Sequence, residues 1–468
     1  MRLSVVSLIC LGLAVVPAIA QESGTKQYED GGVYTGSFKE GKRHGQGVIT
    51  LPNGYEYSGN WVNGEASGQG TARFPDGSLY EGQFDDGKPN GFGKVIFADG
   101  GTYEGDWVNS KIIGRGIAIF TNGARYEGEF LNGHHHGVGT LTNPNGFRYE
   151  GQWAGGVKEG RGKITYPDGS TYDGEMAAGL RHGQGKLGLP DGLTYEGGWV
   201  AGQMEGEGVR VQANGDTYTG SLKAGARDGQ GRMEYADGTF YEGGFKADQR
   251  HGQGTLKRAD GFEYSGQWVD GRVDGQGTVT YPDTSVYVGQ LRNELADGKG
   301  KMTYQDGSTY EGDWVKGVIE GTGITTFPSG LRYEGEFRNA RNEGQGKMTF
   351  PDGKTYEGQW LAGQKHGQGK TTLANGVTYE GSFVDGRREG TGTLTSPAGF
   401  SYVGAWKDDL MEGQGAAVYD NGDSYEGTFK AGKRSGKGVL SYANGDTASG
   451  IWEDGLLVQP DEEPAAQN

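Results

Sequence analysis

Residues 356–369 read Tyr-Glu-Gly-Gln-Trp-Leu-Ala-Gly-Gln-Lys-His-Gly-Gln-Gly, and most of the 468-residue chain repeats this stretch with small changes. The Tyr-x-Gly that opens it recurs every 23 residues from Tyr34 to Tyr425, without an insertion or deletion. Eighteen tyrosines share the spacing, and a nineteenth slot at Ala448 keeps Gly450 and Trp452. A fixed short period over almost the whole chain predicts a repeat array in which each unit packs on its neighbours.

Glycine is the compositional outlier, with 95 residues, and 87 of them fall in five columns of the repeat. Glycine placed so regularly is structural and does not indicate a flexible linker. Collagen requires glycine at every third residue, so the 23-residue period excludes it. No segment of the array has a pattern of its own that would mark a separate globular domain.

Each repeat contains two segments with the alternation of a β-strand. Tyr103, Gly105 and Trp107 occupy alternate positions, which places them on one face of a strand and the intervening acidic residues on the other. Residues 160–166 alternate in the same way, with glycine, isoleucine and tyrosine on one side and arginine, lysine and threonine on the other. We therefore expect two strands per repeat, with the aromatic rings lying flat over bare glycine backbone.

Turn residues separate these segments. An Asx-Gly pair precedes most anchor tyrosines, as in Asn53-Gly54 and Asp352-Gly353, and such a pair accepts positive φ and is a strong hairpin signal. The second turn has glycine seven residues after the tyrosine, as at Gly64. Five repeats replace this glycine, so we expect the second turn to be less demanding there; the replacements are Ser110, Asp248, Glu294, Ala340 and Asp409.

The predicted fold is therefore all-β: an elongated, single-layer antiparallel β-hairpin repeat array with a 23-residue period, forming a twisted rod with an open groove. The motif Tyr-Glu-Gly-x-Trp/Phe-x-x-Gly-x-x-x-Gly-x-Gly closely resembles the MORN (membrane occupation and recognition nexus) repeat over about nine-tenths of the chain. That resemblance implies the same single-layer sheet, and it implies protein partners. A closed β-helix is the structural alternative, but its coils would not need an Asx-Gly hairpin signal.

The termini define the remaining segments. Residues 1–20 have Arg2, an apolar run and Ala-Ile-Ala before Gln21, which predicts a signal peptide cleaved after Ala20 and export to the periplasm or extracellular space. We assign 21–31 to an N-terminal linker or half repeat, 32–455 to the array of about eighteen full repeats with a degenerate C-terminal cap, and 456–468 to a disordered acidic tail. Cys10 lies in the signal, so the mature chain has no thiol chemistry.

All nine tryptophans lie four residues after an anchor position, in alternate repeats. A 46-residue double unit is therefore superimposed on the 23-residue repeat, and its phase slips once, between Leu222 and Phe245. This slip predicts a bend or seam at residues 218–245, and a duplication history without structural effect is the other interpretation.

No catalytic constellation, cofactor motif or metal site is predicted. Five histidines, of which His182 and His366 are examples, share a column beside a turn that also accepts serine, asparagine and glutamate, which favours a turn role. His134-His135-His136 is the one local metal candidate, but a fourth ligand is not evident nearby. The acidic column after the tyrosine, present in most repeats, reads as a solvated face and not as paired glycosidase carboxylates.

The formal charge of −17 argues against nucleic acid and against docking on anionic lipid. The array is therefore predicted to be a non-enzymatic scaffold for protein–protein interaction in the cell envelope. The alternatives are a cell-wall or glycan-binding adhesive surface and a membrane-associated lipid-binding module. Edge strands at the array ends can pair between chains, which would give a homodimer.

The aromatic stripe is both the predicted core and the predicted binding surface, since partly exposed rings along a groove can hold a peptide or a glycan. The twelve predicted groove-lining residues are Tyr57, Trp61, Tyr103, Trp107, Tyr149, Trp153, Tyr310, Trp314, Tyr356, Trp360, Tyr402 and Trp406.

Overall fold

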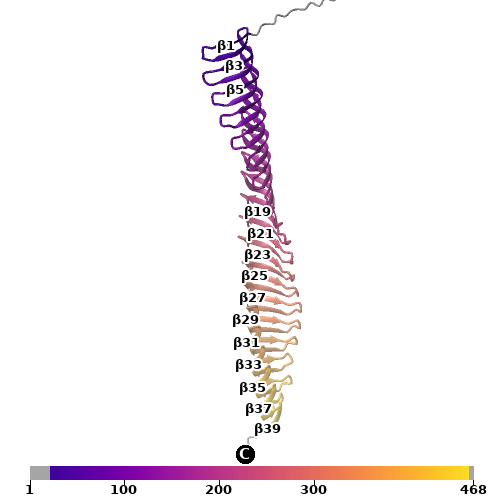
Figure 1. The fold of residues 1–468 in the computed structure, drawn as a ribbon. Coiled ribbons are helices and arrows are strands. Elements are labelled where there is room, and N and C mark those ends of the chain that lie inside the picture. Colours follow the sequence, from indigo (N-terminus) through magenta and orange to yellow (C-terminus); the bar gives the residue numbers. More distant parts are fainter. Residues whose placement is uncertain (1–21, 463–468) are drawn as a thin grey trace, which may run out of the picture. The chain divides into compact units, whose positions relative to one another are not determined.

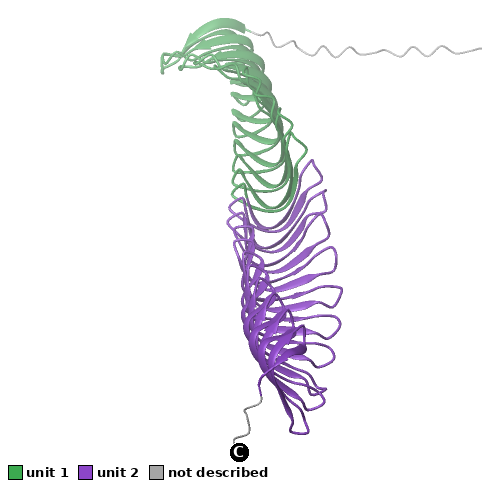
Figure 2. Cartoon of the chain, turned by 90° about the horizontal axis from the view of Figure 1, so that it is seen from below, with its two compact units in different colours: residues 1–226 green, residues 227–468 purple. Residues whose placement is uncertain are grey.

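The fold was analysed in a computed structural model, which describes residues 22–462. It divides into two compact units, residues 1–226 and 227–468 (Figure 2). The predicted signal peptide lies outside the described residues. Residues 22–462 contain thirty-nine strands and no helix, so this part of the chain has no helical segment that could cross a bilayer.

The strands of the first unit alternate between seven and nine residues after a six-residue first strand. They are β1 (Glu22–Gln27), β2 (Val33–Lys39), β3 (Lys42–Thr50), β4 (Glu56–Val62), β5 (Glu65–Arg73), β6 (Leu79–Asp85), β7 (Lys88–Ile96), β8 (Thr102–Val108), β9 (Lys111–Ile119), β10 (Arg125–Leu131), β11 (His134–Thr142), β12 (Arg148–Ala154), β13 (Val157–Thr165), β14 (Thr171–Ala177), β15 (Leu180–Gly188), β16 (Thr194–Val200), β17 (Gln203–Val211) and β18 (Thr217–Lys223).

The second unit continues the alternation from β19, whose first residue belongs to the first unit, through β38, and it ends with a five-residue strand. Its strands are β19 (Ala226–Glu234), β20 (Phe240–Lys246), β21 (Gln249–Lys257), β22 (Glu263–Val269), β23 (Arg272–Thr280), β24 (Val286–Arg292), β25 (Leu295–Thr303), β26 (Thr309–Val315), β27 (Val318–Thr326), β28 (Arg332–Arg338), β29 (Arg341–Thr349), β30 (Thr355–Leu361), β31 (Gln364–Thr372), β32 (Thr378–Val384), β33 (Arg387–Thr395), β34 (Ser401–Lys407), β35 (Leu410–Val418), β36 (Ser424–Lys430), β37 (Lys433–Ser441), β38 (Thr447–Glu453) and β39 (Leu456–Pro460).

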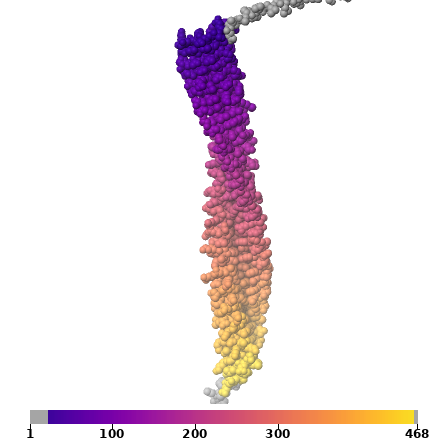
Figure 3. Space-filling view, viewed as in Figure 1, coloured from indigo at the N-terminus to yellow at the C-terminus, as the bar shows by residue number. Residues whose placement is uncertain are grey.

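Within each unit every strand pairs antiparallel with the strands that precede and follow it in the chain (Figure 1). Consequently the colour changes gradually along each unit in Figure 3, and segments distant in sequence do not mix. The predicted all-β hairpin array with a 23-residue period is confirmed. The unit boundary at residues 226–227 falls inside the segment of the phase slip.

Aromatic rings in edge-to-face contact form most of the core of each unit. All eighteen anchor tyrosines are at most 4% exposed. Most contact a ring of their own repeat and a ring of the next: the Tyr80 ring centroid lies 5.1 Å from Phe84 and 5.2 Å from Trp107, with interplanar angles of 87° and 83°. Such T-shaped pairs add about 0.5–1.5 kcal/mol to the burial of the rings themselves. Met176, Leu222 and Leu291 take the place of the second ring in three repeats.

The tyrosine rings lie over paired glycines, as the sequence predicts. Gly59 and Gly70 are directly opposite in β4 and β5, and a Cβ added at Gly70 would lie 2.6 Å from Cζ of Tyr57. Real Cβ atoms do not approach so closely, so any other residue would lift the ring off the sheet. The same row of glycines runs through every complete repeat.

A β-bulge interrupts each repeat, and the sequence pattern did not predict it. Counting the tyrosine as position 0, the glycine at position 11 has a positive φ, as at Gly160 (+67°), where the sequence predicted a flat strand. The bulge leaves backbone groups that side chains satisfy. Tyr57 Oη donates to the carbonyl of Asn60 at position 3 (2.9 Å), and the Asp106 carboxylate at position 3 accepts the N–H of Arg115 at position 12 (3.0 Å).

The second turn joins the two strands of a repeat through two residues that both have positive φ, such as Asn63 (+51°) and Gly64 (+103°). This is the combination that two-residue hairpins with type I′ turns require. The expectation that this turn is less demanding is wrong, because the five residues that replace glycine keep the left-handed backbone conformation. The register of the paired strands requires that conformation whichever residue stands there. The five residues are Ser110 (+67°), Asp248 (+67°), Glu294 (+69°), Ala340 (+60°) and Asp409 (+71°).

The first turn also differs from the predicted Asx-Gly hairpin. In residues 74–78 only Gly77 has positive φ (+94°), and it donates its N–H to the carbonyl of Phe74 (3.0 Å). The Asp76 carboxylate instead accepts the N–H of Ser78 at 2.9 Å. The Asx side chain therefore closes a hydrogen-bonded turn of its own, and the glycine alone supplies the left-handed conformation.

Both ends of the array extend beyond the predicted boundaries of regular structure. Residues 22–27 form β1 and pair with β2, so they act as a half repeat. Leu456–Pro460 form β39 and pair with β38, which contradicts the prediction that disorder begins at residue 456. Backbone pairing at a sheet edge orders these residues although their side chains do not follow the repeat.

Thr284 stands where the first turn of other repeats has glycine, and its φ is +71°. A β-branched residue in this conformation is strained by roughly 1–2 kcal/mol. Thr284→Gly should therefore stabilise the surrounding hairpin by about 1 kcal/mol after the entropy of glycine in the unfolded chain is subtracted. Amide hydrogen exchange of residues 280–286 measures the change.

The matched control is Gly307→Thr, which introduces the same strain at the same turn position of the next repeat. Gly307 has a φ of +81°, and a Cβ there meets only Pro328 Cγ at 3.5 Å, an ordinary contact. Faster exchange is expected for this variant. Unchanged or faster exchange in Thr284→Gly would contradict the assigned turn geometry.

Candidate binding groove

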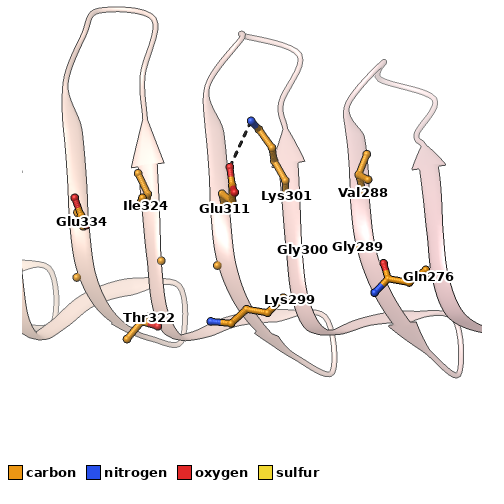
Figure 4. A pocket seen from close by; sticks show the side chains of 13 residues that line it. Gln276, Val288, Gly289, Lys299, Gly300, Lys301, Glu311, Thr322, Ile324 and Glu334 are labelled. Carbon is orange, nitrogen blue, oxygen red and sulfur yellow. Dashed lines mark ion pairs between the residues drawn. The ribbon is translucent and has the colours of Figure 1, made fainter.

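The face of each sheet opposite the aromatic core carries a groove whose floor is the bare backbone of the paired glycines. Figure 4 shows a segment of it in the second unit. Val288, Lys301 and Glu311 lie on one side of the glycine row, and Gln276 and Lys299 lie on the other. The volume of this segment is about 860 Å³, and two segments of the first unit measure about 510 and 650 Å³.

The same positions of successive repeats form the side walls of the groove. Positions 1 and 14 of each repeat form one wall, and positions 3 and 12 form the other, because these positions all point away from the tyrosines. In the first wall Lys301 Nζ lies 3.5 Å from Glu311 Oε2, and in the second wall Lys299 Nζ lies 2.6 Å from Asp313 Oδ1. The acidic column predicted as a solvated face is therefore one wall of the groove, where exposed lysine–glutamate pairs contribute little stability.

Apolar side chains interrupt the polar walls in the first unit. Position 12 carries glutamine in many repeats, including Gln69 and Gln184, but Phe92 and Val138 occupy it here and are 56% and 59% exposed. Ile117, at position 14 of the repeat between them, lines the same segment. Exposed apolar groups gathered in a concave surface are typical of interaction sites.

The twelve residues predicted to line a groove lie instead in the core. Their exposed fractions range from 0 to 8%. Their polar atoms are also used internally: Trp314 Nε1 donates to the carbonyl of Gly300 at 3.2 Å, and Tyr310 Oη donates to that of Asp313 at 2.9 Å. All nine tryptophans make the equivalent bond to a glycine fourteen residues earlier. A binding role for these rings stays a prediction that would require them to leave the core.

The degree of burial of these rings could not be predicted from the sequence pattern. Period-two alternation shows which residues share a face, but it does not show how completely each ring is covered. The exchange of glutamine for Phe92 and Val138 within one column was visible in the sequence and could have indicated the other face.

The three consecutive histidines do not converge on one point. The His135 ring stacks on Tyr126, with centroids 3.7 Å apart and an interplanar angle of 11°. Successive strand side chains point to opposite faces, so His134 and His136 leave on the other side. Burial, and to a lesser degree His134, lowers the pKa of His135 to about 4. Between residues 22 and 462 no group of three or more His, Cys, Asp or Glu side chains is placed to hold a metal ion.

The column at position 10, which contains most of the histidines, lies beside the second turn of the next repeat. Glu159 accepts the N–H of Ala178 at 2.9 Å, and Glu205 accepts that of Ala224 at 2.8 Å. These contacts agree with the turn role expected for the column.

A family model described as the MORN repeat matches eighteen successive segments of the chain. The segments are 34–54, 57–79, 80–102, 103–125, 126–148, 149–171, 172–194, 195–217, 218–240, 241–262, 264–286, 287–309, 310–332, 333–355, 356–378, 379–400, 402–424 and 425–447.

Solved structures give weaker matches. The TCP domain of SAS-4 (dCPAP) from Drosophila melanogaster, in complex with a proline-rich motif of Ana2 (dSTIL), is 14% identical, with 38% of this chain and 90% of that chain covered and a TM-score of 0.23. The TCP10 domain of Danio rerio CPAP with a STIL peptide is 14% identical, with 71% and 97% covered and a TM-score of 0.12. Virginiamycin B lyase from Staphylococcus aureus is 12% identical, with 60% and 90% covered and a TM-score of 0.11. Likenesses at this level carry no argument about this chain.

Burial of the anchor tyrosines predicts how stability depends on pH. Burial raises the pKa of Tyr80 to about 12, and it is the largest cause of the same shift in Tyr149 and Tyr356. Because the unfolded pKa is about 10, the contribution of these tyrosines to stability should be constant below that pH and should be lost as pH rises from about 10 through 12. Tyrosinate absorbance should therefore rise together with the loss of the β-sheet circular dichroism.

The urea-unfolded chain is the control, and its tyrosines should titrate near pH 10. Full ionisation near that pH with an intact sheet signal would contradict the burial of these hydroxyls.

Proposed function

The chain belongs to the MORN repeat family, and from that premise we propose that it is a non-enzymatic scaffold that binds protein partners in the cell envelope. The observation that carries the proposal is the groove floored by glycine, which recurs along both units and exposes backbone and walls to solvent while the aromatic rings are committed to the core. Repeated weak contacts along such a surface sum by multivalency.

The apolar segment in the first unit is the proposed centre of partner binding. Phe92 and Val138 are the exposed large apolar residues of the groove walls there, and the half-buried Ile117 lies in the repeat between them. Buried aromatic anchors carry a large share of binding energy at protein interfaces, whereas rim charges contribute less. Burial of the twelve predicted tyrosine and tryptophan rings removes the observation that favoured a glycan-binding surface.

Export is a second part of the proposal and rests on the sequence of residues 1–20 alone. Fractionation of cells that express the chain with a C-terminal tag, followed by N-terminal sequencing, tests it. A mature protein that begins at Gln21 in the periplasmic or secreted fraction is expected. Recovery of an uncleaved chain in the cytoplasm would contradict export.

The test of partner binding uses the double variant Phe92→Gln/Val138→Gln, because glutamine occupies the same position in many other repeats and the fold should tolerate it. Immobilised wild-type protein should capture a specific protein from an envelope extract, identified by mass spectrometry. The double variant should bind the purified partner about 10- to 100-fold more weakly, since loss of two apolar anchors costs about 2 kcal/mol.

Val403→Glu is the matched control. Val403 is an exposed apolar residue at position 1 in the second unit, where most repeats carry an acid, and its exchange should leave the affinity unchanged. Capture of no specific protein by the wild type would contradict the interaction function. Equal affinity of all three proteins would contradict the assignment of the site to the first unit.

A further inference from the structure

On the aromatic face, position 9 carries arginine in six repeats, and five of these arginines share one arrangement. The guanidinium of Arg388 lies 4.2 Å from the ring centroid of Trp406, and Nη2 donates to the carbonyl of Asp409 at 2.6 Å. In five of the six the acceptor is the carbonyl twenty-one residues further along the chain, whereas Arg250 donates Nη2 to the Tyr235 hydroxyl at 3.0 Å. The equivalent bonds run from Arg43 to Gly64 (3.0 Å), from Arg181 to Gly202 (3.0 Å) and from Arg434 to Gly455 (2.9 Å).

Lys365 occupies this position in the second unit and does not reproduce the bond. Its equivalent acceptor is the carbonyl of Gly386, yet within residues 22–462 the ammonium has neither a hydrogen bond nor an ion pair. Nζ lies among aromatic rings, 5.0 Å from the centroid of Tyr356, 5.8 Å from Phe383 and 6.0 Å from Phe350. An ammonium has three donors, so ring contacts alone leave a half-buried group without an acceptor.

The shorter lysine side chain leaves a cavity of about 210 Å³. Lys354, Lys365 and Arg388 line it together with a single carboxylate, that of Asp409, which is paired with Arg388 Nε at 3.1 Å. Lys354 Nζ lies 5.2 Å and Lys365 Nζ 6.0 Å from the centroid of the Phe350 ring, and both lysines line this one cavity. The cavity therefore carries an excess of two positive charges in a chain whose net charge is −17.

The remaining walls are mostly apolar and include Leu373, Val377 and Phe383, with Thr371 and Tyr379 beside them. The volume corresponds to roughly seven water molecules at ~30 Å³ each. Burial and the charge of Lys354 lower the pKa of Lys365, which a bound anion would reverse. A ligand that fits must combine an anionic head with oxygen acceptors and a short apolar substituent.

We propose that this cavity is a binding site for an organic carboxylate that bears a short apolar or aromatic group. The carboxylate accepts hydrogen bonds from Lys365 and Lys354, and the substituent packs against the leucine, valine and phenylalanine walls. Both a free small acid and the terminal carboxylate of a polypeptide have this chemistry. The site lies on the face opposite the groove, so it does not depend on the proposed function of the groove.

Isothermal titration calorimetry of the full mature chain tests the site with four probes: phenylpropionate, inorganic phosphate, an N-acetylated dipeptide ending in phenylalanine, and the C-terminal amide of that dipeptide. The two carboxylates should bind at one site per chain, at least tenfold more tightly than phosphate or the amide. Tighter binding of the dipeptide acid than of phenylpropionate assigns the site to polypeptide termini, and the reverse order assigns it to free acids. Phosphate binding equal to that of the carboxylates would overturn the role of the apolar walls.

Two variants distinguish binding inside the cavity from nonspecific electrostatic attraction of the anion. Lys365→Met removes the cation, and Lys365→Arg keeps the charge but should reach the Gly386 carbonyl and fill the cavity, as Arg388 does one repeat later. Both should weaken carboxylate binding at least tenfold with an unchanged circular dichroism spectrum. Lys370→Met, which removes an exposed lysine on the groove face 3.4 Å from Glu380, should bind as the wild type does.

Absence of carboxylate binding in the wild-type chain would overturn the proposal. Wild-type affinity in Lys365→Arg would overturn it as well, because the charge alone would then explain the binding.

Discussion

The contact of a tyrosine ring with a pair of bare glycines is the interaction on which the rest of this structure depends. Only the absence of both Cβ atoms lets the ring lie on the sheet, as Tyr57 does over Gly59 and Gly70. In that position its hydroxyl reaches the carbonyl of Asn60 at the bulge. A single side chain thereby buries apolar surface and satisfies a backbone group that would otherwise lack a partner in the sheet.

The same contact determines which face is available for binding. Since the rings, their hydroxyls and the tryptophan N–H groups are all used inside each unit, the aromatic face is mostly closed. Glycine leaves the opposite side of the same strands without side chains, and a groove runs there between two walls of variable residues. Fixed positions build the sheet, and free positions such as those of Phe92 and Val138 can change without disturbing it.

Most of the fold could be predicted from the sequence, because the 23-residue period and the alternation around Tyr103 and Trp107 report directly on strand geometry. The bulge could not, because the glycine at position 11, such as Gly160, looks like one more strand glycine until its positive φ is known. The face that carries the binding groove was harder to predict than the bulge. Alternation assigned the aromatic residues to one face, whereas the exposure of that face depends on ring contacts between successive repeats, which no single repeat encodes. The cavity at Lys365 likewise depends on the reach of one side chain to a carbonyl in the next repeat.

Amide hydrogen exchange of Gly323→Ala tests the central contact most directly. A methyl group there would lie 2.7 Å from Cζ of Tyr310 and must displace the ring. Gly188→Ala is the reference, since that strand glycine has an ordinary φ and its added Cβ meets only the Thr171 hydroxyl at 3.2 Å. Loss of protection in β25–β28 for Gly323→Ala, with near-native protection for Gly188→Ala, is the result expected. Native protection in both variants would show that the strands hold together without the tyrosine lying on bare backbone.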